Sequence, residues 1–209
     1  VTEMIAHTWL HDYLKRLKKH FPQTLVELSV DISINLSKEL QDRSLDLALQ
    51  NAPFNRRMGA EVALGSYPLI WVAAPGIALP DKKVTIEHLA NHPVMTHARY
   101  TQPHEEVTQH FASRRDLHPR LVQSNNVSAS LQMCVNGMGI ATLPEAMVLK
   151  ELDRGELCRI DYGWVPSSLD FFARFDAEKS PSLVQRAADL AAEVSNEFLK
   201  QLYSPSKAK

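Results

Sequence analysis

Residues 125–160 read NNVSASLQMCVNGMGIATLPEAMVLKELDRGELCRI, which begins with a helix, a turn and a strand in succession. Apolar residues recur at helical spacing over residues 127–136, and an apolar run over residues 139–143 then predicts a buried strand. The two glycines follow a helix and precede a strand, whereas a loop that cradles phosphate needs the order strand, glycines, helix. We therefore interpret Gly137 as a left-handed helix cap and Gly139 as a residue that permits close backbone approach.

Helices and strands alternate outward from this stretch in both directions. Expected strands cover residues 26–30, 45–49, 67–75, 94–96, 121–123, 157–160 and 169–175. Expected helices cover residues 7–21, 37–42, 86–90, 105–115 and 182–202. The order of strand, helix and strand over residues 26–49 predicts parallel pairing. The length fits two α/β units of about 80 to 100 residues better than one, and the last helix is expected to dock on the first unit, because the second has helices of its own.

The charge balance argues against a chain that holds nucleic acid by its own contacts. The 209 residues include 23 basic and 24 acidic ones, a formal net charge of −1, with no basic stripe. No apolar run approaches the ~20 residues of a membrane span, and the N-terminal residues do not resemble a signal peptide. Cys134 and Cys158 lie in apolar segments and are expected to be buried free thiols. These features predict a cytoplasmic protein that does not associate with a membrane.

The sequence offers little support for a metal site or for catalysis. The pairs His7/His11 and His88/His92 have i, i+4 spacing, but neither pair has a fixed third ligand, so surface or capping roles are expected. No GxSxG, HExxH or phosphate-loop pattern occurs, and the presence of Ser, His and Asp alone does not define a catalytic triad. We therefore expect no enzymatic activity, no metal and no cofactor.

Small polar residues cluster where the expected strands end and helices begin. Open α/β sheets bind ligands at the carboxyl ends of their strands, so these residues are candidates for a binding site. The candidates are Thr2, Glu3, His7, Thr8, Ser33, Gln50, Asn51, Asn125, Asn126 and Ser128. Helix capping and turn chemistry explain any one cluster alone, but several clusters at one edge favour a cleft. His97 and Arg99 complete the set and favour a negative group on the ligand, whereas Glu3 would reject an anion or accept an amine.

Four segments together resemble the effector-binding region of LysR-type transcriptional regulators. They are FPQTLVELSVDISINLSKELQDRSLDLAL (21–49), LGSYPLIWVAAPGIAL (64–79), VTIEHLANHPVMTH (84–97) and the stretch 125–160 quoted above. The resemblance implies an α/β fold of periplasmic-binding-protein type 2 architecture, with two Rossmann-like subdomains joined by two crossover strands. Subdomain I would comprise residues 1–74 plus 174–209, and subdomain II residues 75–173. A small-molecule effector would bind in the cleft between them.

The same resemblance implies a sensor that controls DNA-bound oligomers. The protein would form a homodimer or tetramer in which the helix over residues 9–21 pairs with the second subdomain of a partner. DNA would be held only by an N-terminal winged helix-turn-helix that this sequence does not contain, and the first strand of subdomain I is also largely missing. One alternative is a solute-binding protein of a transport system with the same fold, and another is an enzyme built on this architecture.

Overall fold

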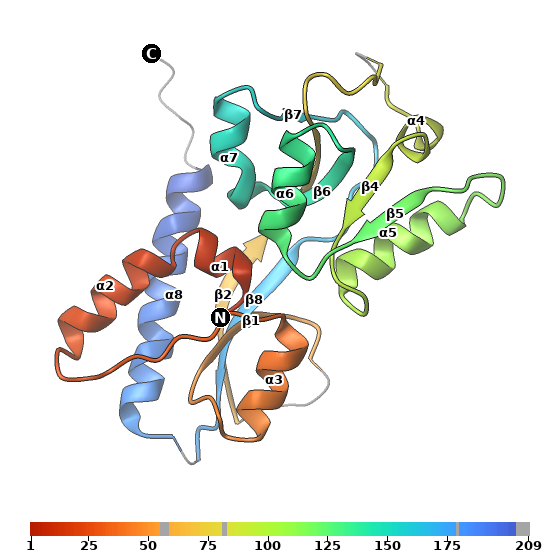
Figure 1. Cartoon of the computed structure of the whole chain (residues 1–209). Helices are drawn as coiled ribbons and strands as arrows, with labels where there is room; N and C mark the ends of the chain where they lie inside the picture. Colours follow the sequence, from red (N-terminus) through yellow and green to blue (C-terminus); the bar gives the residue numbers. More distant parts are fainter. Residues whose placement is uncertain (55–58, 81–82, 179, 204–209) are drawn as a thin grey trace. The chain divides into compact units, whose positions relative to one another are not determined.

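The structure, a computed structural model, describes residues 1–54, 59–80, 83–178 and 180–203 (Figure 1). The chain divides into two compact units, and each is described by itself. Unit 1 holds Val1–Tyr67 and Leu169–Lys209, and unit 2 holds Pro68–Ser168. The resemblance placed the divisions after residues 74 and 173. The structure places both earlier, because the strand after Pro68 pairs within unit 2 and the strand from Leu169 pairs within unit 1.

Unit 1 is built on a three-stranded antiparallel sheet. Its strands are β1 (Ala48–Asn51), β8 (Leu169–Phe175) and β2 (Ala60–Tyr67), in the order β1-β8-β2. The central strand, β8, pairs antiparallel with both neighbours. The parallel pairing predicted from residues 26–49 is therefore wrong for this structure, since β1 pairs with a strand from the far end of the chain.

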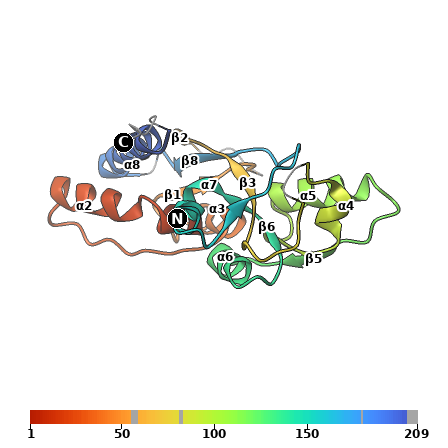
Figure 2. The ribbon, with the colours of Figure 1, turned by 90° about the horizontal axis from the view of Figure 1, so that it is seen from above.

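Four helices accompany this sheet. They are α1 (Glu3–His7), α2 (Leu10–His20), α3 (Ser33–Gln41) and α8 (Ser182–Tyr203). The long helix α8 packs against β2, β8 and α2, and it buries the apolar face formed by Ala187, Leu190, Ala191 and Val194 (Figures 1 and 2). The expectation that the last helix docks on the first unit is confirmed. The helix predicted over residues 7–21 is observed as α2, which begins three residues later than predicted, and the separate short helix α1 precedes it.

A chain of buried hydrogen bonds ties α2, β2 and α8 together. Trp9 Nε1–H donates to the hydroxyl of Tyr67 at 2.9 Å, and that hydroxyl lies 2.6 Å from Ser195 Oγ. Ser195 Oγ in turn donates to the carbonyl oxygen of Leu64. Every member has a partner, so the polar groups lie in the core without an unpaired donor.

Replacing Tyr67 by phenylalanine is expected to lower the free energy of unfolding by about 1–2 kcal/mol, because it leaves the indole N–H of Trp9 buried without an acceptor. Urea unfolding followed by far-UV circular dichroism measures this loss. The matched control is Tyr100→Phe, since Tyr100 is 81% exposed and its loss of a hydroxyl is expected to change little. Equal effects of the two substitutions would show that the Trp9–Tyr67 bond does not stabilise the fold.

The segment between α2 and α3 differs from its prediction. Residues 26–30 alternate as a strand does, yet the structure assigns no strand there. The reason is that these residues form no continuous ladder of backbone hydrogen bonds with a neighbouring strand within the described part of the chain. Among the described residues, the backbone hydrogen bonds of residues 25–31 all go to Val1. Its amine donates to Ser29 O at 2.8 Å, and its carbonyl oxygen accepts from Asp31 N–H at 3.1 Å. A strand needs a paired neighbour, which alternation alone does not supply.

Unit 2 is built on a five-stranded mixed sheet in the order β5-β4-β6-β3-β7. Its strands are β3 (Leu69–Ala73), β4 (Pro93–Thr96), β5 (Arg120–Gln123), β6 (Ile140–Pro144) and β7 (Cys158–Arg159), and its helices are α4 (Ile86–Ala90), α5 (Gln102–Ala112), α6 (Val127–Val135) and α7 (Glu145–Asp153). β4 pairs parallel with β5 and β6, whereas β3 pairs antiparallel with β6 and β7. The core includes Trp71, Leu89 and Phe111. Both cysteines are free, but Cys158 is exposed on the edge strand β7, so the prediction of burial holds only for Cys134.

The turn between α6 and β6 has the character predicted from its two glycines. Gly137 follows the helix with φ +71°, the left-handed conformation of a helix cap. Gly139 lies against the neighbouring strand, where a Cβ atom would come within 2.2 Å of the carbonyl oxygen of Pro93. Both interpretations are confirmed, and the turn sets the distance between β6 and β4.

Candidate functional site

A small pocket in unit 2 lies where β4 and β5 end and α6 begins. Its lining residues are Met95, Thr96, His97, Ser124, Val127, Ser130, Thr142 and Leu143. The parallel strands β5, β4 and β6 bring their carboxyl ends to this edge, which is where an α/β sheet places its ligand. The space between these residues does not enclose a water molecule in this conformation and is far below the ~300–1,000 Å³ of a typical small-molecule site. A functional group of a ligand could therefore enter only if the lining side chains moved apart.

Two threonine hydroxyls in this pocket have no hydrogen-bond partner among the described residues. Thr96, at the end of β4, is 2% exposed, and Thr142, in β6, is 1% exposed. A buried hydroxyl without a partner costs about 1–3 kcal/mol, and native structures retain few such groups. Both belong to residues that line the same pocket, so a ligand oxygen bound there would supply the missing partner.

The start of α6 forms another side of the pocket. Asn126 caps this helix, with its side-chain oxygen accepting from Ala129 N–H at 2.6 Å. Ser124 holds the preceding turn, because its hydroxyl donates to Asn126 O at 2.9 Å and accepts from Asn126 N–H at 3.0 Å. The positive end of the helix dipole thus lies at Val127, which lines the pocket. The capping role predicted for Asn126 is confirmed, and its side chain is engaged with the helix.

His97 lies beside the threonines and is neutral at physiological pH. Its Nε2 lies 3.1 Å from the carbonyl oxygen of Thr142. Burial lowers the pKa of His97 to about 4, and this loss of hydration outweighs the hydrogen bond to Thr142. A neutral ring that donates from Nε2 keeps Nδ1 as an acceptor. The pocket therefore offers hydroxyl groups and an imidazole without a fixed positive charge.

The depressed pKa of His97 predicts a loss of stability in acid. The unfolded chain, with an ordinary histidine pKa near 6.5, binds the proton more readily, so stability is full above pH 6.5 and falls as the pH drops towards 4. Between pH 7.5 and pH 5 this histidine is expected to remove about 2 kcal/mol. Urea unfolding at the two pH values measures the loss, and His97→Gln should reduce it by that amount. An unchanged pH dependence in the variant would contradict the assignment.

The remaining unit 2 candidates lie outside this pocket. Arg99 is exposed, and its guanidinium donates to the side chain of Gln123. Asn125 is exposed in the turn before α6, and Ser128 is partly buried in the first turn of that helix. Sequence reasoning therefore found His97 but missed Thr96, Ser124, Ser130 and Thr142. The missed signal is a polar residue inside an apolar strand, as in the run GIATL that contains Thr142.

In unit 1 the structure brings four of the predicted residues to β1. Thr2 N–H donates to Leu49 O at 3.1 Å, and the buried Thr2 hydroxyl has no partner in the described residues. Ser33 Oγ donates to Asn51 Oδ1 at 2.8 Å and accepts from Asn51 N–H at 3.1 Å. Gln50 is fully buried, with Oε1 accepting from the Ser37 hydroxyl and Nε2 lacking a partner within the same described set.

The other unit 1 candidates have helical positions. Glu3 is partly buried in the first turn of α1, and His7 is exposed in its last turn. The Thr8 hydroxyl donates to Met4 O at 2.8 Å, which makes Thr8 part of the end of that helix. These contacts are those of helix ends, the alternative that the sequence left open for any one cluster.

A buried arginine in unit 1 escaped the sequence analysis. Arg174, in the central strand β8, is 1% exposed and donates from Nε to Glu61 Oε1 at 2.9 Å. Its guanidinium carbon lies 3.8 Å from the ring centroid of Phe54. Burial lowers the pKa of Arg174, but the carboxylate of Glu61 opposes that effect, so the side chain stays charged.

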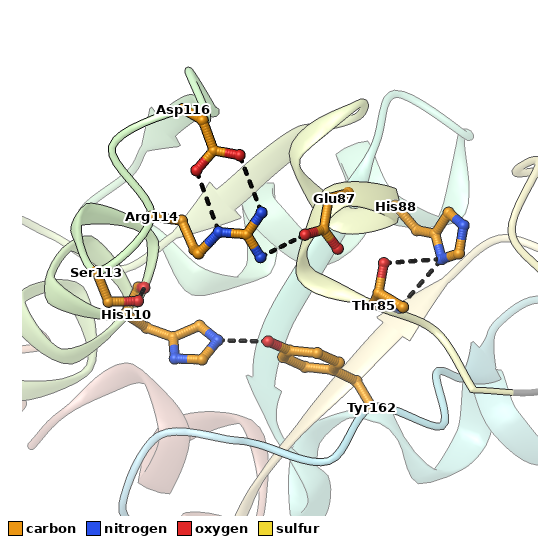
Figure 3. Close-up of polar contacts among 8 residues, drawn as sticks. All are labelled: Thr85, Glu87, His88, His110, Ser113, Arg114, Asp116 and Tyr162. Atoms are coloured by element: carbon orange, nitrogen blue, oxygen red, sulfur yellow. Dashed lines mark hydrogen bonds and ion pairs between the residues drawn. The ribbon is translucent and has the colours of Figure 1, made fainter.

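A polar network on another part of unit 2 fixes α4, α5 and the segment after β7 (Figure 3). Arg114 bonds to Glu87 and, at 2.9 Å, to Asp116, and His110 Nε2 lies 2.5 Å from the hydroxyl of Tyr162. The ion pairs of Arg114 are substantially exposed, so solvent screens them and each contributes little to the stability of unit 2. This network has a structural role and shares no residue with the pocket.

The contacts of the two histidine pairs agree with the surface or capping roles expected of them. His88 accepts from the backbone N–H of Thr85 at 3.1 Å and so completes a capping box at α4. His92 Nε2 lies 3.2 Å from Ala78 O, and both His7 and His11 are exposed. Among the described residues, no three His, Cys, Asp or Glu side chains gather as a metal site would require.

Residues 1–196 match the family described as "LysR substrate binding domain". The chain belongs to this family. It is similar to the HTH-type transcriptional regulator PtxR of Pseudomonas aeruginosa, with 27% identity over 149 residues, and the match covers 70% of this chain but 46% of PtxR. The chain thus spans about half the length of that relative. It carries the effector-binding regulatory domain of a LysR-type transcriptional regulator, which is not an enzyme.

Solved LysR-type regulatory domains share the fold along nearly the whole length. The regulatory domain of Synechocystis PCC6803 CcmR, in complex with 2-PG, gives a TM-score of 0.77 at 18% identity, covering 93% of this chain and 94% of that one. The NMB2055 (MetR) domain of N. meningitidis gives 0.71 at 17% identity, with 94% and 92% covered. The LysR domain therefore has the periplasmic-binding-protein type 2 architecture that the resemblance implied. Within the described residues, every helix is too short or too polar to cross a membrane.

Proposed function

We propose that the pocket of unit 2 binds the anionic group of a small organic effector, and that this binding sets the activity of the regulator. The pair of unpartnered hydroxyls on Thr96 and Thr142, beside the positive end of α6, carries the proposal. The CcmR domain was solved with 2-PG and an OxyR2 domain of Vibrio vulnificus with sulfate, so related domains accept small molecules or anions. These neighbours share the fold at 18–20% identity and do not define the ligand.

The chemistry of the lining favours an oxyanion over a cation. A carboxylate or phosphate oxygen accepts hydrogen bonds from both threonine hydroxyls and gains from the helix dipole. The lining residues include no Asp or Glu to repel it and no Lys or Arg to neutralise it. The anion would therefore be held by hydrogen bonds and by the dipole, with His97 remaining neutral. In unit 1, Thr2, Ser33, Gln50 and Asn51 form a second polar group that we propose as additional effector contacts.

The family and the charge of this domain support a proposal for the wider role of the whole regulator. We propose a cytoplasmic regulator that acts as a homodimer or tetramer. A formal net charge of −1 supports DNA contacts made by another part of the regulator. The effector would act by favouring one of two conformations of the domain, which requires that it bind one of them more tightly.

Substituting Thr142 or Thr96 by valine tests the pocket. Valine keeps the shape of threonine and removes the hydroxyl, so each variant should bind an anionic ligand at least about 10-fold more weakly. The free energy of unfolding without ligand should stay the same or rise, because a buried unpaired hydroxyl is removed. Binding is measured as the shift in melting temperature that small mono- and dicarboxylates and phosphorylated acids produce, since a ligand that binds the native state raises that temperature.

The matched control is Arg99→Ala, which removes an exposed cation outside the pocket lining and should leave the shift intact. Thermal shifts that persist in both threonine variants, or that require Arg99, would overturn the assignment of the anion to this pocket. Equal shifts with uncharged amides of the same acids would overturn the preference for an oxyanion.

A further inference from the structure

The imidazole ring of His97 is held in one tautomer by a backbone carbonyl group. His97 follows β4 directly and lines the pocket of unit 2 together with Thr96 and Thr142. Its Nε2 lies 3.1 Å from Thr142 O. Burial lowers the pKa of His97 to about 4, so the ring is neutral at physiological pH and carries a proton on one nitrogen. Because a carbonyl oxygen only accepts hydrogen bonds, that proton lies on Nε2, and Nδ1 keeps its lone pair.

The lone pair of Nδ1 is available to a ligand. Among the described residues, His97 forms a hydrogen bond through Nε2 and none through Nδ1. The residue is only partly buried, so solvent can satisfy Nδ1 until a ligand enters. A ligand that excludes solvent from the pocket leaves Nδ1 without a partner unless the ligand itself donates a hydrogen bond. This acceptor therefore discriminates between ligands with and without a donor.

The two threonines offer the opposite chemistry. The hydroxyls of Thr96 and Thr142 are buried without a partner in the described part of the chain, and each can donate to a ligand oxygen. A simple carboxylate accepts from both hydroxyls but has no hydrogen to give to Nδ1 of His97. An ammonium group would supply that hydrogen, but the positive end of α6 disfavours a cation. A neutral hydroxyl group on the ligand is the donor that fits.

We propose that His97 selects an effector with a hydroxyl group next to its carboxylate, the hydroxyl donating to Nδ1 while Thr96 and Thr142 donate to the carboxylate. This inference rests on the function proposed above, in which the same pocket holds the anion. Because the three residues line one small pocket, the two ligand groups must be close together, as they are in a 2-hydroxy acid. The lining includes no Lys or Arg, which favours a singly charged carboxylate over a doubly charged phosphate.

Matched acids that differ in one group test this selection on the 209-residue chain. One set is lactate, propionate and 2-methoxypropionate, and the other is malate, succinate and 2-methoxysuccinate. In at least one set the hydroxy acid should bind about 3- to 10-fold more tightly than the acid without the hydroxyl, which leaves Nδ1 unpaired. The methyl ether has the oxygen but no donor, so it should bind no more tightly than the unsubstituted acid. Titrations followed by NMR give the dissociation constants.

Substitutions at His97 assign the preference to Nδ1. Glutamine provides an amide N–H that can replace the Nε2 donor to Thr142 O but provides no acceptor at the position of Nδ1, so His97→Gln should bind both acids about equally. Asparagine provides an amide oxygen near the position of Nδ1, so His97→Asn should keep a preference for the hydroxy acid. The matched control is His92→Gln, because His92 Nε2 also lies near a backbone carbonyl, Ala78 O, but outside the pocket lining. It should keep the preference of the parent.

Nitrogen-15 NMR of the His97 ring provides a readout independent of affinity. Nε2 should be protonated and Nδ1 unprotonated with and without ligand, and the Nδ1 resonance should shift when the hydroxy acid binds. A proton on Nδ1, or a preference that persists in His97→Gln, would overturn the role of this atom. Equal binding of the hydroxy and unsubstituted acids, weakened alike by Thr142→Val, would overturn the selection and leave the anion pocket standing. No binding of any of the six acids would overturn both.

Discussion

Gly139→Ala is expected to lower the free energy of unfolding by about 3–5 kcal/mol. The added Cβ would lie 2.2 Å from Pro93 O and 3.0 Å from Pro93 C, both of them backbone atoms of β4. A backbone atom cannot rotate away as a side chain does, so β4 and β6 must separate where Val94 pairs with Ile140. The φ of +158° at Gly139 adds strain for any other residue.

Gly137→Ala separates the effect of the steric clash with β4 from the effect of backbone strain at a positive φ. Gly137 also has positive φ, at +71°, but a Cβ there meets no atom within 4 Å. Its cost is therefore backbone strain alone, about 1–2 kcal/mol. Urea unfolding of the two variants gives both values, and expression as soluble protein gives a second readout if Gly139→Ala fails to fold. Equal losses at the two positions would show that the approach of β6 to β4 is not tight.

Glu61→Ala is expected to lower the free energy of unfolding by about 2–3 kcal/mol, more than the removal of its positively charged partner. Arg174 is 1% exposed, so the loss of Glu61 leaves a buried guanidinium without its carboxylate. Glu61 is itself 36% exposed at the side chain, and solvent screens the pair in part, which places the cost below that of a fully buried ion pair.

The reverse substitution should cost less. Arg174→Met keeps the apolar stem against Phe54 and removes the buried charge, and Glu61 can then turn to water, so a loss of about 1 kcal/mol or less is expected. Chemical denaturation of the two variants, side by side, measures both. A larger loss for Arg174→Met than for Glu61→Ala would mean that the guanidinium has a favourable role of its own in unit 1.

The sequence predicted correctly the features that depend on a few neighbouring residues, and it failed where a feature depends on residues far apart in the chain. The turn at Gly137 and the strand Leu169–Phe175 are encoded within a few residues and were predicted well. Residues 26–30 have the alternation of a strand, but a strand exists only with a partner, and partners lie far along the chain. Helix α7 was not predicted, because it begins directly after Pro144 at the end of β6 and no loop separates the two elements.

The same limit applies to the site. His97 and Asn126 stood out as polar residues near strand and helix ends, and both lie at the pocket or its helix. Thr96 and Thr142 lie within apolar runs, where a threonine is an ordinary strand residue. Their significance depends on two facts that only coordinates provide, namely that they line one pocket and that neither hydroxyl has a partner in the described residues.

Each unit contains a tryptophan whose contacts affect its fluorescence in a different way. Trp9 is buried in unit 1 and hydrogen-bonded to Tyr67, whereas in unit 2 the ring of Trp164 stacks on His110 at 3.7 Å between centroids. A protonated imidazole in contact with an indole quenches its emission, and a neutral imidazole does so much less. The emission of Trp164 is therefore expected to change when His110 takes up a proton, whereas the emission of Trp9 depends on unit 1 and Trp71 adds a third contribution from unit 2. Protonation of His110 in unit 2 can thereby be followed by light emission, without any attached dye.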